Sequence, residues 1–192
     1  MSTGSRRQRW DAARNHDQVL AAARDLFSTR GLATDVREIA TLAGVGVATL
    51  YRHFPTKDDL VRAAVADDLA EWWALTRRAA AEEDAWSGLC AFVEQTLATM
   101  ARHRAVLDGV MAPAAAPAAF EACHTHLRAE LDGLVRRAHQ QGTLRPEVSA
   151  ADVSLLVLAL GQVVRHTAES PDAWRRHTHL VLDGLHVRAA RR

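Results

Sequence analysis

Several residue types are scarce in this 192-residue chain, and their scarcity excludes whole classes of protein. The two cysteines, Cys90 and Cys123, lie far apart in sequence and have no CxxC neighbour, so we expect a reducing cytoplasm and two small core residues. The longest uncharged runs, 39–51, 109–120 and 153–164, have only twelve or thirteen residues, whereas a bilayer-spanning helix needs about twenty. No apolar segment follows the Arg-rich N-terminus, so no signal peptide is predicted.

Lysine is almost absent, because Lys57 is the only one and every other basic residue is arginine or histidine. The net charge is only +1, so the whole chain is not a polycation. Residues 1–57, however, carry nine basic and five acidic residues. A basic module on a near-neutral body predicts a polyanionic partner for that module. On charge alone, a solvated charged surface is an equally good interpretation.

Helix-forming residues dominate the remainder, with much alanine and leucine, a single tyrosine and only short β-branched runs. We find no strand pattern and no internal repeat, so the predicted fold is all-α with about nine helices. Apolar spacing, cap residues, glycines and prolines place these helices at about 11–30, 36–43, 46–53, 56–82, 85–103, 104–111, 117–141, 149–168 and 170–189. Residues 1–10 are polar, basic and without periodicity, which predicts a disordered arm.

Residues 34–57 combine two short helices around a glycine turn, which is the pattern of a helix-turn-helix. Asp35, three residues before Glu38, predicts an acidic capping box at the start of the first of these helices. In the second, Leu50 and Phe54 fall on the inward face, whereas Thr49 and Arg52 fall on the outward face. Arginine can donate two hydrogen bonds to guanine, and threonine can contact a base edge or a phosphate.

The motifs of residues 14–60 resemble the N-terminal module of the TetR family of bacterial transcriptional repressors. The matching signals are Gly31, Thr34 with Asp35, VREIA at 36–40, AGV at 43–45, TLYRHF at 49–54, and Pro55-x-Lys57. They cover about a quarter of the chain, and the later helices match the family in number, length and order. A homeodomain-like three-helix module at 11–55 and a ligand-binding and dimerisation domain at 56–192 are therefore expected.

The resemblance implies a homodimer that binds a near-palindromic operator in double-stranded DNA. It implies phosphate contacts for Thr34, Tyr51, His53 and Lys57, and base reading by positions 46–52. Val47 and Ala48 depart from the polar residues common in the family, so base reading is expected to rest more on Thr49, Arg52, thymine methyl contacts and DNA shape. The candidate DNA-contacting residues are Thr34, Arg37, Gly46, Val47, Ala48, Thr49, Tyr51, Arg52, His53 and Lys57.

Two simpler interpretations of the N-terminal third stay open. The three helices can be a core module with an incidental basic face, although the order of the motifs favours DNA binding. The arm with Arg6, Arg7 and Arg9 can reach the minor groove, or it can be a plain disordered tail.

The ten histidines suggest a metal or catalytic site, but their spacing argues against one. In 124–126 and 177–179 the paired histidines are two residues apart, so on a helix they point in nearly opposite directions. No phosphate loop, GxSxG or zinc-protease motif is present. We therefore expect neither enzymatic activity nor a metal or cofactor. A helical enzyme or metal-binding protein that retains a helix-turn-helix is the weaker alternative.

The resemblance implies a ligand cavity between the middle helices, and aromatic and methionine side chains suit a planar or greasy ligand. The candidate ligand-binding residues are Trp72, Trp73, Phe92, Thr96, Met100, Met111, Phe120, Cys123 and His124. For each residue taken alone, ordinary core packing is the favoured interpretation.

The eighth predicted helix is apolar nearly all round, so it must be covered on more than one side. Together with the ninth helix it predicts half of a four-helix dimer interface, although a well-buried monomer core is the alternative. The candidate interface residues are Val153, Leu156, Val157, Leu160, Gly161, Val164, Trp174, Val181 and Leu185. Such a dimer would place two recognition helices one DNA turn, roughly 34 Å, apart.

The sequence thus predicts a cytoplasmic bacterial regulator that binds DNA. We expect a repressor released from its operator when a small-molecule effector of unknown identity binds the C-terminal domain. A dimeric DNA-binding regulator without a ligand is the other interpretation.

Overall fold

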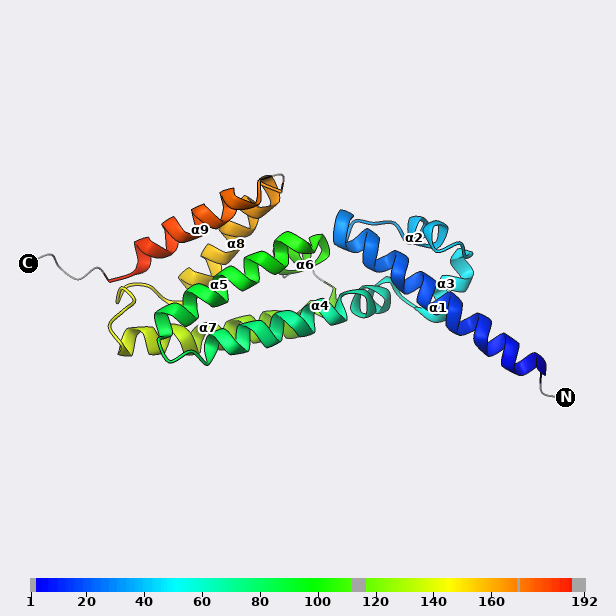
Figure 1. Cartoon of the computed structure of the whole chain (residues 1–192), viewed down its shortest axis with the longest axis horizontal. Coiled ribbons are helices and arrows are strands. Elements are labelled where there is room, and N and C mark those ends of the chain that lie inside the picture. Colours follow the sequence, from blue (N-terminus) through cyan, green and yellow to red (C-terminus); the bar gives the residue numbers. More distant parts are fainter. Residues whose placement is uncertain (1–2, 112–116, 169, 188–192) are drawn as a thin grey trace, which may run out of the picture.

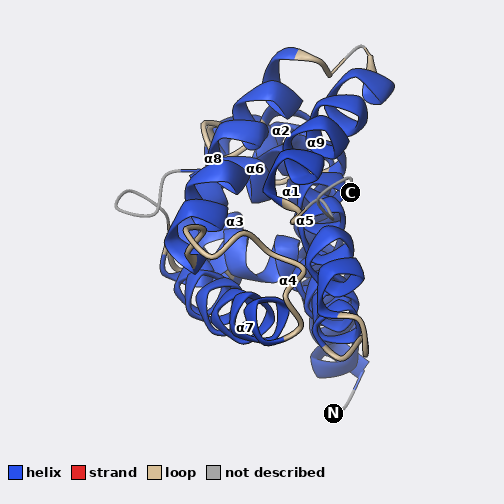
Figure 2. Cartoon of the chain, turned by 90° about the vertical axis from the view of Figure 1, so that its left-hand side faces the viewer, coloured by secondary structure: helices blue, strands red, loops and turns tan. Residues whose placement is uncertain are grey.

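The computed structural model describes residues 3–111, 117–168 and 170–187, which form helices joined by short loops (Figure 2). This confirms the all-α prediction. The helices are α1 (Thr3–Arg30), α2 (Val36–Leu42), α3 (Val47–His53), α4 (Lys57–Ala80), α5 (Ala85–Arg102), α6 (Arg104–Met111), the 3-10 helix η2 (Ala118–Phe120), α7 (Glu121–Gln140), α8 (Ala150–His166) and α9 (Pro171–Leu185). No helix in the described ranges is long and apolar enough to cross a membrane.

The first three helices pack together at one end of the molecule (Figure 1). Val19, Ala23 and Phe27 project from α1 and are almost fully buried. They meet Ile39 from α2 and Leu50 from α3 in the same hydrophobic cluster. The predicted helix-turn-helix is therefore formed, and its apolar residues hold α3 against the two preceding helices.

The expected disorder of residues 1–10 is wrong for residues 3–10, because α1 begins at Thr3. Extending an existing helix adds one hydrogen bond per residue without a new nucleation step, so a polar segment without apolar periodicity can still be helical. Residues 1–2 lie outside the described part of the chain. The N-terminal end of α1 projects beyond α2 and α3 (Figure 1), where Trp10 is 62% exposed.

Side-chain caps fix where several helices begin. Thr56 caps α4 and Asp84 caps α5, and Thr56 forms a full capping box with Asp59. Asp35 also caps α2 by accepting the Arg37 N–H at 2.8 Å. The acidic capping box predicted there is wrong, since the Glu38 carboxylate instead pairs with Arg30 at 2.5 Å.

The long α4 leads from the N-terminal module into the body, where it packs along α5 and α7 (Figure 1). The central helix of the body is α5, because it also contacts α6, α8 and α9. Its residues Leu89, Phe92, Val93 and Leu97 are fully buried. The module and the body also meet directly, since α1 packs against both α4 and α6.

Two helix limits in the C-terminal half differ from the sequence prediction. Pro117 precedes the short η2, and α7 starts only at Glu121. The last helix, α9, ends at Leu185 rather than near residue 189, because His186 pairs with Leu144 in an isolated β-bridge. The Arg145 N–H also donates to the Leu185 carbonyl at 3.0 Å, which turns the chain away from the helix axis.

Candidate nucleic-acid interface

The outward face of α3 carries the side chains predicted to meet DNA. Val47 is 36% and Tyr51 42% exposed, and Ala48 and Arg52 are also exposed. Thr49 is half-buried, whereas Leu50 points into the core with 1% exposure. Gly46 precedes the helix and has open space around it. A short helix with small and polar side chains outward and a leucine inward can lie against a groove of DNA.

The end of α3 is fixed by rings from α1. The His16 ring stacks on Phe54 with centroids 4.9 Å apart, and it meets His53 edge-to-face at 5.9 Å. Phe54 is 5% exposed and His53 is half-buried. His16 therefore sets the position of α3 relative to α1, a role that the sequence pattern did not reveal.

The flanking residues predicted to contact phosphates fall into two groups. Arg37 is exposed at the start of α2. Thr34, in contrast, is only 5% exposed and its hydroxyl donates to the Gly31 carbonyl at 2.8 Å. The Lys57 ammonium donates to the Leu32 carbonyl at 2.7 Å. Thr34 and Lys57 thus hold the turn between α1 and α2, and their phosphate contacts stay predictions.

Most residues of the predicted ligand cavity pack tightly in the core of the body. Trp72, Phe92, Thr96, Met100, Phe120 and Cys123 are each at most 2% exposed. The indole N–H of Trp72 donates to the Thr96 hydroxyl at 3.2 Å, so two of the expected polar contacts satisfy each other. Met111, Trp73 and His124 are half-buried, and the His124 ring lies 3.1 Å from the Gly109 carbonyl.

The cysteines behave as core residues. Burial raises the pKa of the Cys123 thiol to about 11 and that of Cys90 to about 12. The Trp73 side chain acts in the opposite direction on the pKa of Cys123, but its effect is smaller than that of burial. Such thiols stay protonated and weakly nucleophilic at neutral pH.

A histidine that the sequence did not single out lies between α4 and α7. The His126 Nε2 atom is 2.8 Å from the Thr76 hydroxyl, and its ring meets Trp72 edge-to-face at 5.4 Å. Burial lowers the pKa of His126, and the nearby Glu130 opposes that effect only in part. Within the described residues, no group of three or more His, Cys, Asp and Glu side chains could hold a metal ion.

Six of the nine residues predicted for the dimer interface are buried within the protomer and so do not form its outer surface. The buried members are Val153, Val157, Leu160, Gly161, Val164 and Trp174. Leu156, Val181 and Leu185 are half-buried. The apolar residues that face outward are instead Leu155 on α8, which is 65% exposed, and Leu180 on α9, which is 58% exposed. A helix that is apolar all round does not reveal which side its own chain covers.

Two family models match this chain. Residues 19–64 match the model described as bacterial regulatory proteins, tetR family. Residues 84–187 match the C-terminal domain of SbtR-like transcriptional regulators. The first match covers the helix-turn-helix and the start of α4, and the second covers most of the body.

Curated relatives resemble part of the chain. It is 42% identical over 94 residues to the HTH-type transcriptional repressor Rv3405c of Mycobacterium tuberculosis, which covers 47% of this chain and 46% of that protein. It is 41% identical over 61 residues to the HTH-type transcriptional repressor KstR2 of Mycolicibacterium smegmatis, covering 31% and 29%. The chain thus spans less than half the length of these relatives.

A solved structure resembles nearly the whole chain. The crystal structure of the TetR transcription regulatory protein from Mycobacterium vanbaalenii is 30% identical, with a TM-score of 0.54. The likeness covers 94% of this chain and 99% of that chain.

Proposed function

This chain belongs to the TetR family of bacterial regulatory proteins, and from that premise we propose that it is a sequence-specific DNA-binding repressor. The relatives named as transcriptional repressors support this proposal. In it, residues 11–55 form the reading module, residues 56–192 form the regulatory body, and the protein works in the cytoplasm.

The observation that carries the proposal is the exposed face of α3. Arg52 and Tyr51 project outward while Leu50 fixes the helix from behind, so the polar groups are free to meet DNA. We assign base reading to Arg52 and Thr49, with Val47 and Ala48 in contact with thymine methyl groups. Tyr51, His53 and Arg37 are assigned to phosphates.

We further propose that the protein binds its operator as a homodimer through the outer face of α8 and α9. Leu155 and Leu180 are large apolar side chains that the protomer leaves exposed. Ala159 on α8 is also exposed, and Gly184 on α9 has nothing within 4 Å of an added Cβ, so a partner helix can approach closely. This outer face replaces the buried one predicted from the sequence.

We also propose that a small-molecule effector releases the protein from its operator. The effector binds at a different place from the cavity that the sequence predicted. The packed core around Trp72 and Phe92 offers no ready space for a ligand, because the Trp72 and Thr96 polar groups already satisfy each other. We therefore expect the effector to bind elsewhere in the molecule, and a DNA-binding regulator without a ligand is the alternative.

Selection of bound DNA from random oligonucleotides tests the proposed function. The native protein should enrich a near-palindromic sequence, and Arg52→Ala and Thr49→Ala should each lose preference at defined positions, at a cost of about 1–3 kcal/mol per good base contact. Arg136→Ala, which removes an exposed arginine from α7, serves as the matched control and should select the native sequence. No salt-dependent enrichment of any sequence would contradict the proposal.

A further inference from the structure

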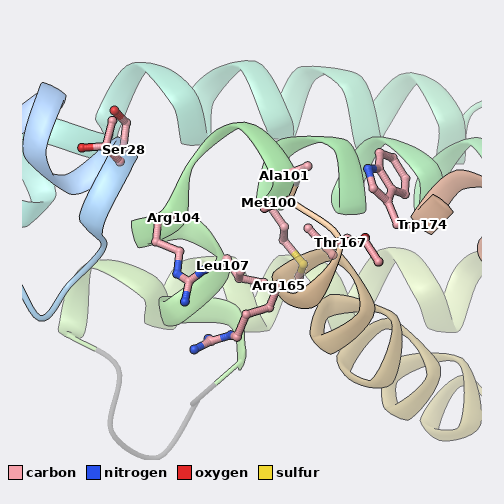
Figure 3. A pocket seen from close by; sticks show the side chains of 11 residues that line it. Ser28, Met100, Ala101, Arg104, Leu107, Arg165, Thr167 and Trp174 are labelled. Atoms are coloured by element: carbon pink, nitrogen blue, oxygen red, sulfur yellow. The ribbon is translucent and has the colours of Figure 1, made fainter. Parts of the chain in front are cut away.

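A hollow of about 200 Å³ lies where the N-terminal module meets the body. The end of α1 forms one wall, and α5, α6, α8 and the turn before α9 form the others (Figure 3). An apolar protein cavity of about 150 Å³ can hold benzene, so this hollow has room for a molecule slightly larger than that. Its lining includes Met100 but neither Trp72 nor Phe92.

The floor of the hollow is apolar and its rim is polar. Met100, Leu107, Val164 and Trp174 line the floor, and each is at most 3% exposed. In Figure 3 the Met100 side chain lies in the middle of the group, with Trp174 on one side and the arginines of the rim on the other. A ligand with an apolar body would therefore remove this surface from water.

Two guanidinium groups converge on one edge of the hollow. The Arg165 Nη2 atom is 3.0 Å and the Arg104 Nε atom 3.6 Å from the same carboxylate oxygen of Asp108. None of the described residues that line the hollow is acidic. The Arg165 Nε atom is also buried and has no hydrogen-bond partner in the described part of the chain. Two cations that share a single carboxylate leave positive charge and donor capacity for an anion.

Asp108 connects this edge to the DNA-binding module. Its second carboxylate oxygen accepts the Leu32 N–H at 3.1 Å, and the Leu32 carbonyl accepts the Lys57 ammonium at 2.7 Å. Gly31, next to Leu32, has φ 80°, and a Cβ there would lie 2.1 Å from Asp108. Only a glycine allows this approach. One carboxylate is therefore shared between the arginines and the turn between α1 and α2.

We propose that this hollow binds a small carboxylate with an apolar body, and that the ligand competes with Asp108 for Arg165 and Arg104. A planar carboxylate can accept paired hydrogen bonds from a guanidinium, which suits Arg165 and its free Nε–H. When Arg165 and Arg104 bind the ligand, Asp108 loses its ion pairs with them. Asp108 then no longer holds the turn at Leu32 in a fixed position. The consequence for DNA rests on the proposed function: the ligand shifts the module relative to the body and weakens operator binding.

Benzoate is a suitable probe, and the protein has only three methionines to report on it. In protein labelled with ¹³C at the methionine methyls, the Met100 signal should shift saturably with a dissociation constant of about 1 mM, as expected for a fragment of this size. Benzyl alcohol tests the need for charge, and inorganic phosphate tests the need for an apolar body. The proposal would be overturned if benzyl alcohol or inorganic phosphate bound as tightly as benzoate. It would also be overturned if the Met100 signal showed no saturable shift at a benzoate concentration ten times the expected dissociation constant.

Variants test which groups hold the carboxylate. Arg165→Gln should weaken benzoate binding by about tenfold or more, and Arg104→Gln gives a second test on a more exposed side chain. Arg102→Gln, an exposed arginine on α5 that pairs with Glu71 instead, is the matched control and should bind as the native protein does. Asp108→Asn should bind benzoate more tightly, because the competing charge is gone while an oxygen still faces Leu32. Undiminished binding by both Arg165→Gln and Arg104→Gln would overturn the site.

Measurements of operator affinity distinguish a failure of this proposal from a failure of the proposed function. Saturating benzoate should lower operator affinity, and operator DNA should lower benzoate affinity by the same factor. Benzoate binding without any change in operator affinity would overturn the coupling but leave the repressor function standing. If the protein selects no DNA, the proposed function fails, and the methionine signals still decide whether the hollow binds a carboxylate.

Discussion

His126 shows how strongly one side chain depends on its surroundings. It lies between Trp72 and Trp73 of α4, with the Thr76 hydroxyl 2.8 Å from its Nε2 atom. Burial is the main reason for its lowered pKa, because the charged imidazolium would lose water that Thr76 does not replace. The folded protein therefore keeps His126 neutral at a pH where the unfolded chain already binds the proton.

This difference predicts a loss of stability in mild acid. The contribution of His126 is fully present above its ordinary pKa of 6.5 and is lost as the pH falls from there through the lowered value. The free energy of unfolding in urea should therefore fall more between pH 7.5 and pH 5.5 in the native protein than in His126→Gln. Equal losses in the two proteins would assign the pH dependence to other groups.

Single residues were predictable where geometry is local and not where it depends on distant parts of the chain. The inward Leu50 and outward Arg52 follow from helical spacing within seven residues. The contact of Asp108 with Leu32 joins positions 76 apart in sequence, and no sequence periodicity predicts it. The same is true of the hydrogen bond that the Lys57 ammonium donates to a carbonyl 25 residues away.

At the scale of elements, the pairing of α4 with α5 depends on a close approach at Gly88. A Cβ at this position would lie 2.5 Å from the Ala79 carbonyl of α4 and 3.1 Å from Leu134 of α7. A backbone carbonyl cannot move without shifting its helix. Gly88 therefore lies where α4, α5 and α7 pack closely together.

Replacement of this glycine should be costly. Gly88→Ala is expected to lower the free energy of unfolding by on the order of 1–3 kcal/mol, because α4 and α5 must separate. Gly133→Ala provides the comparison, since Gly133 lies within α7 and an added Cβ meets nothing within 4 Å. That change should stabilise the protein by about 0.5–1 kcal/mol through helix propensity alone. Thermal or urea unfolding measures both, and similar effects of the two substitutions would contradict the packing argument.

Helix starts were easier to predict than helix ends. The start of α4 follows from Thr56, because the residues that complete a cap lie within one turn of it. The end of α9 depends on the bridge between His186 and Leu144, a segment that joins α7 to α8. The helical start of α1 was missed because polar residues that extend a helix leave no apolar pattern.

For the whole molecule, the proposed dimer determines how far apart two recognition helices lie. The exposed Leu155 and Leu180 place apolar surface on α8 and α9. These two helices belong to the body, and α3 lies at the other end of the molecule (Figure 1). A two-fold axis through this surface would place each leucine against the same leucine of the partner protomer, or against a residue next to that leucine.

A charge on that surface should separate the protomers. Leu155→Glu and Leu180→Glu are each expected to convert the protein from dimer to monomer at micromolar concentration, because the two-fold axis places both copies of the carboxylate in one apolar interface. Light scattering coupled to size-exclusion chromatography measures the mass. Ala129→Glu adds the same charge to an exposed position on α7 and should leave the dimer intact. Dimers of native mass in both leucine variants would place the interface elsewhere.

Which side of α8 faces a partner could not be predicted from the sequence, since the helix is apolar on all sides. The side that looked best, with Val157 and Gly161, is covered within the protomer by methionines, and an added Cβ at Gly161 would lie 2.4 Å from the sulfur of Met111. The face of α8 with Val157 and Gly161 is therefore used in folding, whereas Leu155 stays exposed.

The single lysine also has a practical consequence for following this molecule in solution. Lys57 is the only side-chain amine in the chain, and its ammonium lies at the turn between α1 and α2. Reductive methylation with ¹³C-formaldehyde would therefore introduce one side-chain label, in addition to that on the terminal amine, at the junction of module and body. Changes in that single resonance would report the state of the junction without any engineered residue.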